Sequence, residues 1–280
     1  MEKRLKKYFP IFALPTLIAF SIAFLIPFVM GMYLSFTKFT TVVDAKWVGF
    51  SNYAKALENK EFLNALWFTT KFTVASVISI NVVAFILALL LTRGKRGSNV
   101  FRSVFFMPNL IGGIVLGYIW QLIINGVLYK FGVTLTYDPS YGFWGLVLLM
   151  NWQLIGYMMI IYIAGIQNVP EDLIEAAKID GAGPFRVLRS VTIPMIMPAV
   201  TICLFLTTSN SFKLFDQNLA LTAGAPSKKT AMLALDIYNT FYGRVGWEGV
   251  GQAKAVIFFV LVTIIAFAQL ILTKSKEVEH

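Results

Sequence analysis

The segment Glu175-Ala-Ala-Lys-Ile-Asp-Gly-Ala-Gly-Pro-Phe-Arg-Val-Leu-Arg-Ser-Val-Thr-Ile-Pro194 is a charged interruption between two long apolar runs. Just before it, Pro170 and the acidic residues that follow suit the first turn of a helix. Gly181 is a favourable residue for the end of that helix, because glycine adopts the left-handed turn without strain. Pro184 can then open a second short helix. The pattern predicts a helix over about 170–180, a turn and a second short helix.

Outside this segment the chain is predominantly apolar. Of its 280 residues, 58% are hydrophobic, and the mean hydropathy is +0.72. A bilayer core of roughly 30 Å needs about 20 helical residues. Strand-like alternation is missing from the long apolar runs, so helices rather than a barrel are expected. We place six transmembrane helices at about 11–36, 70–92, 104–126, 143–166, 191–213 and 252–273. The fold class predicted is all-α integral membrane, with residues 1–280 forming a single domain.

Basic residues predict the orientation of these helices, because cytoplasmic loops are enriched in Lys and Arg. With six helices, four basic segments fall on one side of the membrane. They hold Lys3, Arg4, Lys6, Lys7, Arg93, Lys95, Arg96, Arg102, Lys178, Arg186, Arg189, Lys274 and Lys276. We therefore expect both termini in the cytoplasm. The formal net charge of +10 is explained by this bias, so no nucleic-acid partner is expected.

The charged segment resembles the conserved cytoplasmic loop of binding-protein-dependent ATP-binding-cassette importers. In that family Glu-Ala-Ala is followed at a fixed distance by Gly, then by a hydrophobic pair and Pro. The matching positions here are Glu175, Ala176, Ala177, Gly181, Val191, Ile193 and Pro194. Val191, where the family more often has Ile, is a mild departure. A plain hairpin joining two membrane helices is the alternative interpretation of the segment.

The resemblance implies the type I importer permease fold and a location in the bacterial or archaeal cytoplasmic membrane. It also implies that loop 167–194 couples the chain to a separate ATPase. The coupling residues would be Glu175, Ala176, Ala177, Asp180, Gly181, Arg186 and Pro194. The implied partners are a second homologous permease subunit, an ATPase dimer that binds ATP and Mg, and an extracytoplasmic sugar-binding protein.

Polar residues inside the predicted helices are candidates for a substrate site, because such residues usually face a cavity or another helix. Gln153 and Tyr157 lie four residues apart on one helix face, whereas Asn151 lies off that face. Amide, hydroxyl and aromatic groups suit a neutral, hydroxyl-rich ligand. The alternative role is hydrogen bonding between helices, worth about 0.6 kcal/mol per contact.

The chain also resembles the maltose-transporter type of subunit, over the stretches 151–157, 163–170, 215–216 and 222–226. By position relative to Glu-Ala-Ala, the sugar-contacting positions of that family fall on Asn151, Gln153, Tyr157, Thr207, Asn210 and Ser211. Leu154 and Leu214 depart from the maltose-binding set, so the sugar need not be maltose. A phosphorylated polyol such as glycerol phosphate stays open as a substrate, as does the identity of the partner permease.

Several other classes of function fit the sequence poorly. No Gly-x-x-x-x-Gly-Lys-Ser/Thr motif is present, so ATP must be bound elsewhere. We expect no catalytic residues, no metal site and no cofactor in this chain, because His280 is the single histidine and Cys203 the single cysteine. A secondary transporter and a structural membrane protein are the remaining alternatives. The sequence shows no deep Asp, Glu or His for ion coupling, which disfavours the secondary transporter.

Overall fold

The computed structural model describes residues 2–92 and 97–274, with side chains described from residue 9 onward. The chain divides into two units, one of residues 1–62 and 237–258, the other of residues 63–236 and 259–280. Several residues used to predict the orientation lie outside the described side chains: Lys3, Arg4, Lys6, Lys7, Arg93, Lys95, Arg96 and Lys276. His280 also lies outside the described residues.

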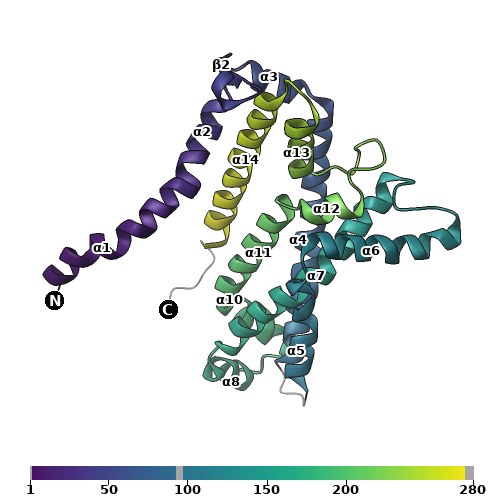
Figure 1. The fold of residues 1–280 in the computed structure, drawn as a ribbon. Helices are drawn as coiled ribbons and strands as arrows, with labels where there is room; N and C mark the ends of the chain where they lie inside the picture. The colour runs from purple at the N-terminus through teal and green to yellow at the C-terminus, as the bar shows by residue number, and fades with distance from the viewer. Residues whose placement is uncertain (1, 93–96, 275–280) are drawn as a thin grey trace. The chain divides into compact units, whose positions relative to one another are not determined.

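The first unit begins with one long curved helix made of α1 (Glu2–Phe20), a π-helical turn η1 (Ser21–Leu25) and α2 (Ile26–Leu34) (Figure 1). A short antiparallel hairpin follows, in which β1 (Thr37–Lys38) pairs with β2 (Lys46–Trp47). The 3-10 turn η2 (Val42–Asp44) joins these strands, and α3 (Ser51–Glu58) comes next. The side chain of Asp44 accepts hydrogen bonds from the backbone of Thr40 and Thr41, which holds the pKa of its carboxyl below the usual value.

Asn52 fixes the hairpin to α3. Its buried side chain donates to the backbone oxygens of Ser35 at 2.9 Å and Thr37 at 2.8 Å. The helix that begins at Ser51 breaks at Asn59. The Asn59 side chain accepts from the backbone N–H of Phe62 at 2.9 Å and so caps the start of the next helix.

The second unit consists of helices and their connections. These are most of α4 (Lys60–Leu91), α5 (Ser98–Phe106), η3 (Met107–Leu110), α6 (Gly113–Leu128), η4 (Tyr129–Phe131), α7 (Pro139–Gln167), α8 (Glu171–Ile179), α9 (Pro184–Val187), η5 (Leu188–Thr192), α10 (Ile193–Met195), α11 (Met197–Phe212) and α12 (Asp216–Leu221). Helices α13 (Leu233–Gly243) and α14 (Glu248–Lys274) contribute to both units.

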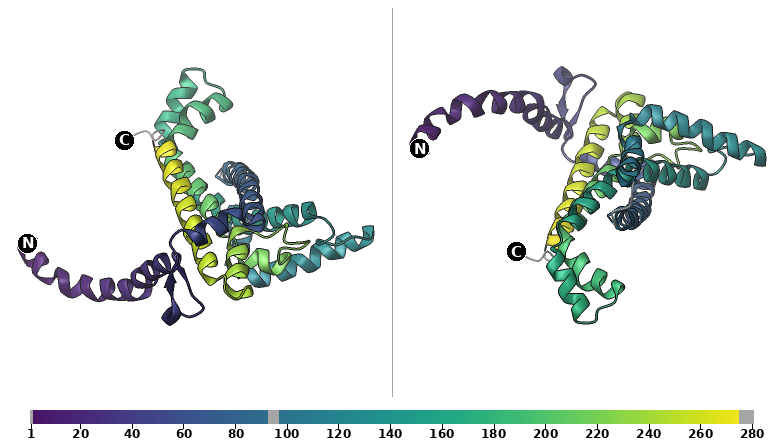
Figure 2. Two further views of the ribbon diagram at one scale, coloured as in Figure 1. Left: turned by 90° about the horizontal axis from the view of Figure 1, so that it is seen from above. Right: turned by 90° about the horizontal axis from the view of Figure 1, so that it is seen from below.

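Helix α7 is the centre of the second unit. Most of its apolar window is buried, and Leu146, Leu149, Met158 and Met159 are fully covered. It runs parallel to α4, because the Phe143 ring packs on Phe68 near the start of both helices and Tyr162 packs on Phe85 nearer their ends. The hairpin of α8 and α9 projects from the C-terminal end of α7 (Figure 2).

Five helices of the described chain are long and apolar enough to cross a membrane, or six if a bent pair is counted as one span. The bent pair joins Pro184–Met195 to Met197–Phe212 at an angle of 71°. The span expected at 104–126 is interrupted: η3 ends at Leu110, the backbone is extended at Ile111 and Gly112, and α6 starts at Gly113. Pro108 lacks a backbone donor and Gly112 and Gly113 are poor helix formers, so the local sequence disfavours a continuous helix there.

Candidate functional site

A cavity of about 440 Å³ lies among α7, the end of α11 and the start of α12. Three of the six residues predicted to contact substrate line it, namely Gln153, Tyr157 and Asn210. Four other polar groups of the wall are not among the residues predicted from the sequence to contact substrate. They are Asn109, Lys213, Asp216 and Gln217.

Gln153 is held in place from two sides. Its side-chain oxygen accepts a hydrogen bond of 2.8 Å from the Gln217 amide, and its own amide donates to the backbone oxygen of Ile111 at 3.4 Å. The second contact depends on the extended backbone after η3, since a helical Ile111 would bond its oxygen within the helix. The interruption of the predicted span therefore helps to position a cavity residue.

Tyr157 stands one helical turn beyond Gln153 on α7, and its ring packs edge-on against Phe106 with centroids 6.2 Å apart. The cavity thus offers amide groups, a phenol, an ammonium and a carboxylate together with the apolar side chains of Met150, Leu154 and Phe215. Such a wall can hydrogen-bond hydroxyl groups and also cover an apolar face of a ligand. Lys213 and Asp216 add one positive and one negative group to a site predicted from the sequence to be neutral.

The other three predicted residues do not line this cavity. Asn151 donates to the Ser79 hydroxyl at 2.9 Å and to the backbone oxygen of Val147 at 2.8 Å. Thr207 is fully buried and accepts a hydrogen bond from the Asn81 amide at 3.0 Å. Ser211 is fully buried, and its hydroxyl has no hydrogen-bond partner in the described part of the chain. The bonds from Asn151 to Ser79 and from Asn81 to Thr207 link helices to one another.

The loop around Glu175 has a well-defined local structure. Helix α8 ends in a Schellman turn, in which Gly181 N–H donates to Lys178 O at 3.0 Å and Ala182 N–H donates to Ala177 O at 2.9 Å. Gly181 has a φ of +79°, which favours glycine. Glu175, Ala176 and Asp180 are exposed.

Large apolar side chains near Glu175, Ala176 and Asp180 in the sequence are also exposed. Ile179 has 86% and Phe185 has 74% of its surface accessible, and Leu173 is exposed on the first turn of α8. Arg186 is exposed next to Phe185, whereas Pro194 is half-buried in α10. Clustered apolar groups of this kind, mixed with charged residues, are typical of protein interaction sites.

A buried cation was missed in the sequence analysis. Lys254 in α14 is fully buried, donates to the Thr240 hydroxyl at 2.8 Å and lies 5.2 Å from the centre of the Phe62 ring. Lys254 is the third residue of the span expected at 252–273, so this buried cation lies near one end of that span. No group of three or more His, Cys, Asp or Glu residues arranged as metal ligands occurs within residues 2–92 and 97–274.

Residues 80–278 match the family described as "Binding-protein-dependent transport system inner membrane component". The chain belongs to this family. It is therefore a transport permease rather than an enzyme, and a multi-pass protein of the cytoplasmic membrane.

Curated relatives cover nearly the whole permease. It is 46% identical over 278 residues to the probable starch degradation products transport system permease protein AmyD of Thermoanaerobacterium thermosulfurigenes, covering 96% of this chain and 94% of the relative. It is 29% identical to the multiple sugar-binding transport system permease protein MsmF of Streptococcus mutans, covering 99% of each chain.

A solved structure has the same fold. A chain of a bacterial ABC transporter involved in the import of the acidic polysaccharide alginate superposes with a TM-score of 0.81 at 19% identity, covering 98% of each chain. At this identity the likeness concerns the fold alone. The family match and the fold agree on the permease architecture.

Proposed function

We propose that this permease is a membrane subunit of an ATP-driven carbohydrate importer and forms half of the translocation pathway. The observation that carries the proposal is the cavity at Gln153, Tyr157 and Asn210, whose amide and phenol groups suit hydroxyl-rich ligands. The curated relatives with sugar-transport names support this substrate class. ATP and Mg would be bound by a partner ATPase, because the chain has no phosphate-binding loop.

Coupling to the ATPase would pass through α8. The small side chains of Ala176 and Ala177 allow another protein to approach the backbone closely, and the exposed Ile179 and Phe185 provide apolar area for docking. Because the hairpin follows α7 and leads through η5 and α10 into α11, a movement of α8 can be passed to both walls of the cavity. Glu175, Asp180 and Arg186 would form the charged rim of this contact.

Two further partners follow from the same proposal. A second permease would complete the pathway, since the span Phe9–Leu34 buries none of its apolar window within the chain. An extracytoplasmic sugar-binding protein would deliver the substrate. The chain would lie with both termini in the cytoplasm, because this places α8 and the basic segments on the side where ATP is available.

The proposal can be tested with the assembled importer in proteoliposomes. Sugars delivered by the binding protein should stimulate ATP hydrolysis and their own uptake, and Gln153→Ala should weaken both. Asn99→Ala changes an exposed amide away from the cavity and serves as a matched control. Full uptake of every sugar tested by Gln153→Ala and Tyr157→Ala would place the substrate site elsewhere.

Lys213 in the cavity wall favours a second candidate, a phosphorylated polyol such as glycerol phosphate, because an ammonium binds phosphate oxygens well. Asp216 in the same wall opposes an anion. In the same proteoliposomes, uptake of glycerol phosphate that is lost in Lys213→Gln, with no response to neutral sugars, would select this candidate.

A further inference from the structure

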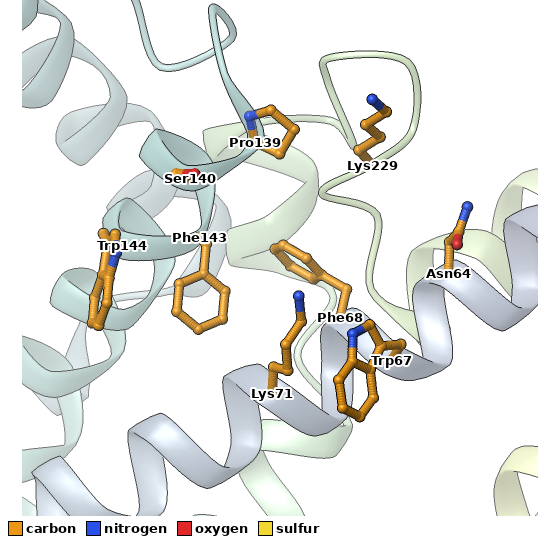
Figure 3. A pocket seen from close by; sticks show the side chains of 9 residues that line it. All are labelled: Asn64, Trp67, Phe68, Lys71, Pro139, Ser140, Phe143, Trp144 and Lys229. Carbon is orange, nitrogen blue, oxygen red and sulfur yellow. The ribbon is translucent and has the colours of Figure 1, made fainter.

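A second cavity, of about 400 Å³, lies where α4 and α7 begin, beside the loop between α12 and α13 (Figure 3). Its walls include four aromatic rings and two lysines: Trp67, Phe68, Phe143, Trp144, Lys71 and Lys229. It shares no residue with the cavity at Gln153. The pocket, named here the aromatic–lysine pocket, has no part in the function proposed above.

The aromatic–lysine pocket sits at the edge of the membrane-spanning part of α4. Residues 72–91 contain no charged side chain, and at 1.5 Å per residue they span roughly the 30 Å of a hydrocarbon core. Lys71 therefore falls at the boundary between hydrocarbon and headgroups. Since α4 and α7 run parallel, both helices present their starting ends here, away from the α8 hairpin that follows the end of α7.

The two tryptophans of the pocket are largely exposed, Trp67 to 63% and Trp144 to 62%. Indole rings favour the membrane interface, where the apolar ring meets lipid and the N–H meets headgroups. Lys71, Val74 and Ile78 follow Trp67 along the same face of α4. The side chains of Val74 and Ile78 are more than half exposed. The pocket therefore opens onto an exposed apolar stripe of α4.

The charge inside the pocket is positive. The Lys71 ammonium lies 5.5 Å from the centre of the Trp67 ring and points toward the space between Phe68 and Phe143 (Figure 3). Within the described residues, neither Lys71 nor Lys229 forms an ion pair with a carboxylate. Asp138 is near enough to Lys229 for the lysine's charge to help lower the pKa of its carboxyl, although hydrogen bonds from Ser140 lower that pKa more.

We propose that the aromatic–lysine pocket binds an anionic phospholipid, with the phosphate of its headgroup at Lys71 and Lys229 and an acyl chain along Val74 and Ile78. The lysines supply the charge that an anionic headgroup requires. The exposed apolar stripe distinguishes this occupant from a soluble anion or an acidic protein, because neither would use a surface buried in hydrocarbon. Asn64 and Ser140 in the wall provide further hydrogen-bonding groups for a glycerol headgroup.

The proposal is tested by photo-crosslinking on the purified full chain with its co-purifying subunits, in nanodiscs. A photoreactive phosphatidylglycerol should label peptides that contain Trp67–Lys71 and Pro139–Trp144, and a photoreactive phosphatidylcholine should label them much less. Lys71→Gln and Lys229→Gln should each reduce the labelling about fivefold. Lys71→Arg and Lys229→Arg should restore it, and Lys130→Gln, an exposed lysine outside the pocket, should leave it unchanged.

Three outcomes would overturn the proposal. The first is equal labelling by the phosphatidylcholine probe, which would mean ordinary bilayer contact. The second is loss of labelling on addition of soluble glycerol phosphate or inorganic phosphate, which would point to a free anion as the ligand. The third is loss of labelling when the substrate-binding protein is added, which would identify a protein-docking surface. None of these readouts depends on transport, so the proposed function can fail without affecting this test.

Discussion

The Tyr162 hydroxyl donates a hydrogen bond of 2.8 Å to the side-chain oxygen of Asn81. The amide of the same Asn81 donates to the Thr207 hydroxyl at 3.0 Å, and Thr207 donates to the Cys203 backbone oxygen at 2.7 Å. Three membrane helices, α4, α7 and α11, are therefore connected through one buried asparagine. In lipid no water can replace these bonds, so all three side chains depend on one another.

Asn81→Leu should destabilise the permease, because it leaves the Tyr162 and Thr207 hydroxyls without their interhelical partner. Hydrogen bonds between membrane helices are worth about 0.6 kcal/mol on average, so the loss of two predicts about 1–2 kcal/mol. The measurement is the thermal midpoint of the purified protein in detergent. Tyr162→Phe, which removes one bond, should cost less, and a larger effect of Tyr162→Phe than of Asn81→Leu would contradict the network.

Thr207→Val and Asn210→Ala should have different effects, because Thr207 bonds to another helix whereas Asn210 lines the cavity. Thr207 is fully buried and bonded to Asn81, so its loss should lower stability without changing the substrate concentration that gives half-maximal uptake. Asn210 lines the cavity, so its loss should raise that concentration several-fold, as expected for about 1 kcal/mol of a lost hydrogen bond. Uptake measured over a range of substrate concentrations distinguishes the two. The reverse pattern would support the prediction that Thr207 contacts substrate.

Gly156→Ala should disrupt the packing of α7 on α5. A Cβ at Gly156 would lie 1.8 Å from the backbone oxygen of Phe105, which no side-chain rotation can relieve. We expect a loss of about 3 kcal/mol or more, at the upper end of overpacking effects, and poor recovery of folded protein. Gly126→Ala is the matched control, because this helical glycine has open space around it. Gel-filtration yield in mild detergent measures both, and equal yields would show that the contact is not rigid.

Gly181→Val should uncouple ATP hydrolysis from transport while leaving membrane insertion intact. The space around Gly181 is open, so the cost comes only from its φ of +79°, about 1–2 kcal/mol for a residue with Cβ. Gly181→Asn should behave nearly as wild type, because asparagine tolerates the left-handed region. ATPase activity and uptake measured together in proteoliposomes give the coupling ratio. Normal uptake by Gly181→Val would remove the turn from the coupling mechanism.

Residue pattern alone predicts much of this fold, because apolar length directly reflects bilayer thickness. The helix after Pro170, the turn at Gly181 and the second helix at Pro184 also lie where the local sequence places them. The helix break at Asn59 was not predicted. It depends on the Asn59 side chain capping the next helix, and an asparagine can also sit within a continuous helix.

The site was predictable only in part. Helical spacing places Gln153 and Tyr157 on one face of a helix, and both line the cavity. Spacing does not determine whether Thr207 lines a cavity or bonds to Asn81, which is distant in sequence. Gln217 reaches Gln153 from another helix, and Lys254 is buried by contacts with Thr240 and Phe62. Such long-range contacts depend on how the helices pack, so they cannot be predicted from the local sequence.

The central claim is that this permease works as the membrane half of an ATP-driven importer. The most direct measurement is a mild-detergent purification of the tagged chain from its native membranes, with mass spectrometry of the proteins that accompany it. The account predicts recovery of an ATPase with a phosphate-binding loop and a second permease, with the ATPase lost in a variant that carries Ala176→Arg and Ala177→Arg. Recovery of the chain alone, under conditions that keep related importers intact, would contradict it.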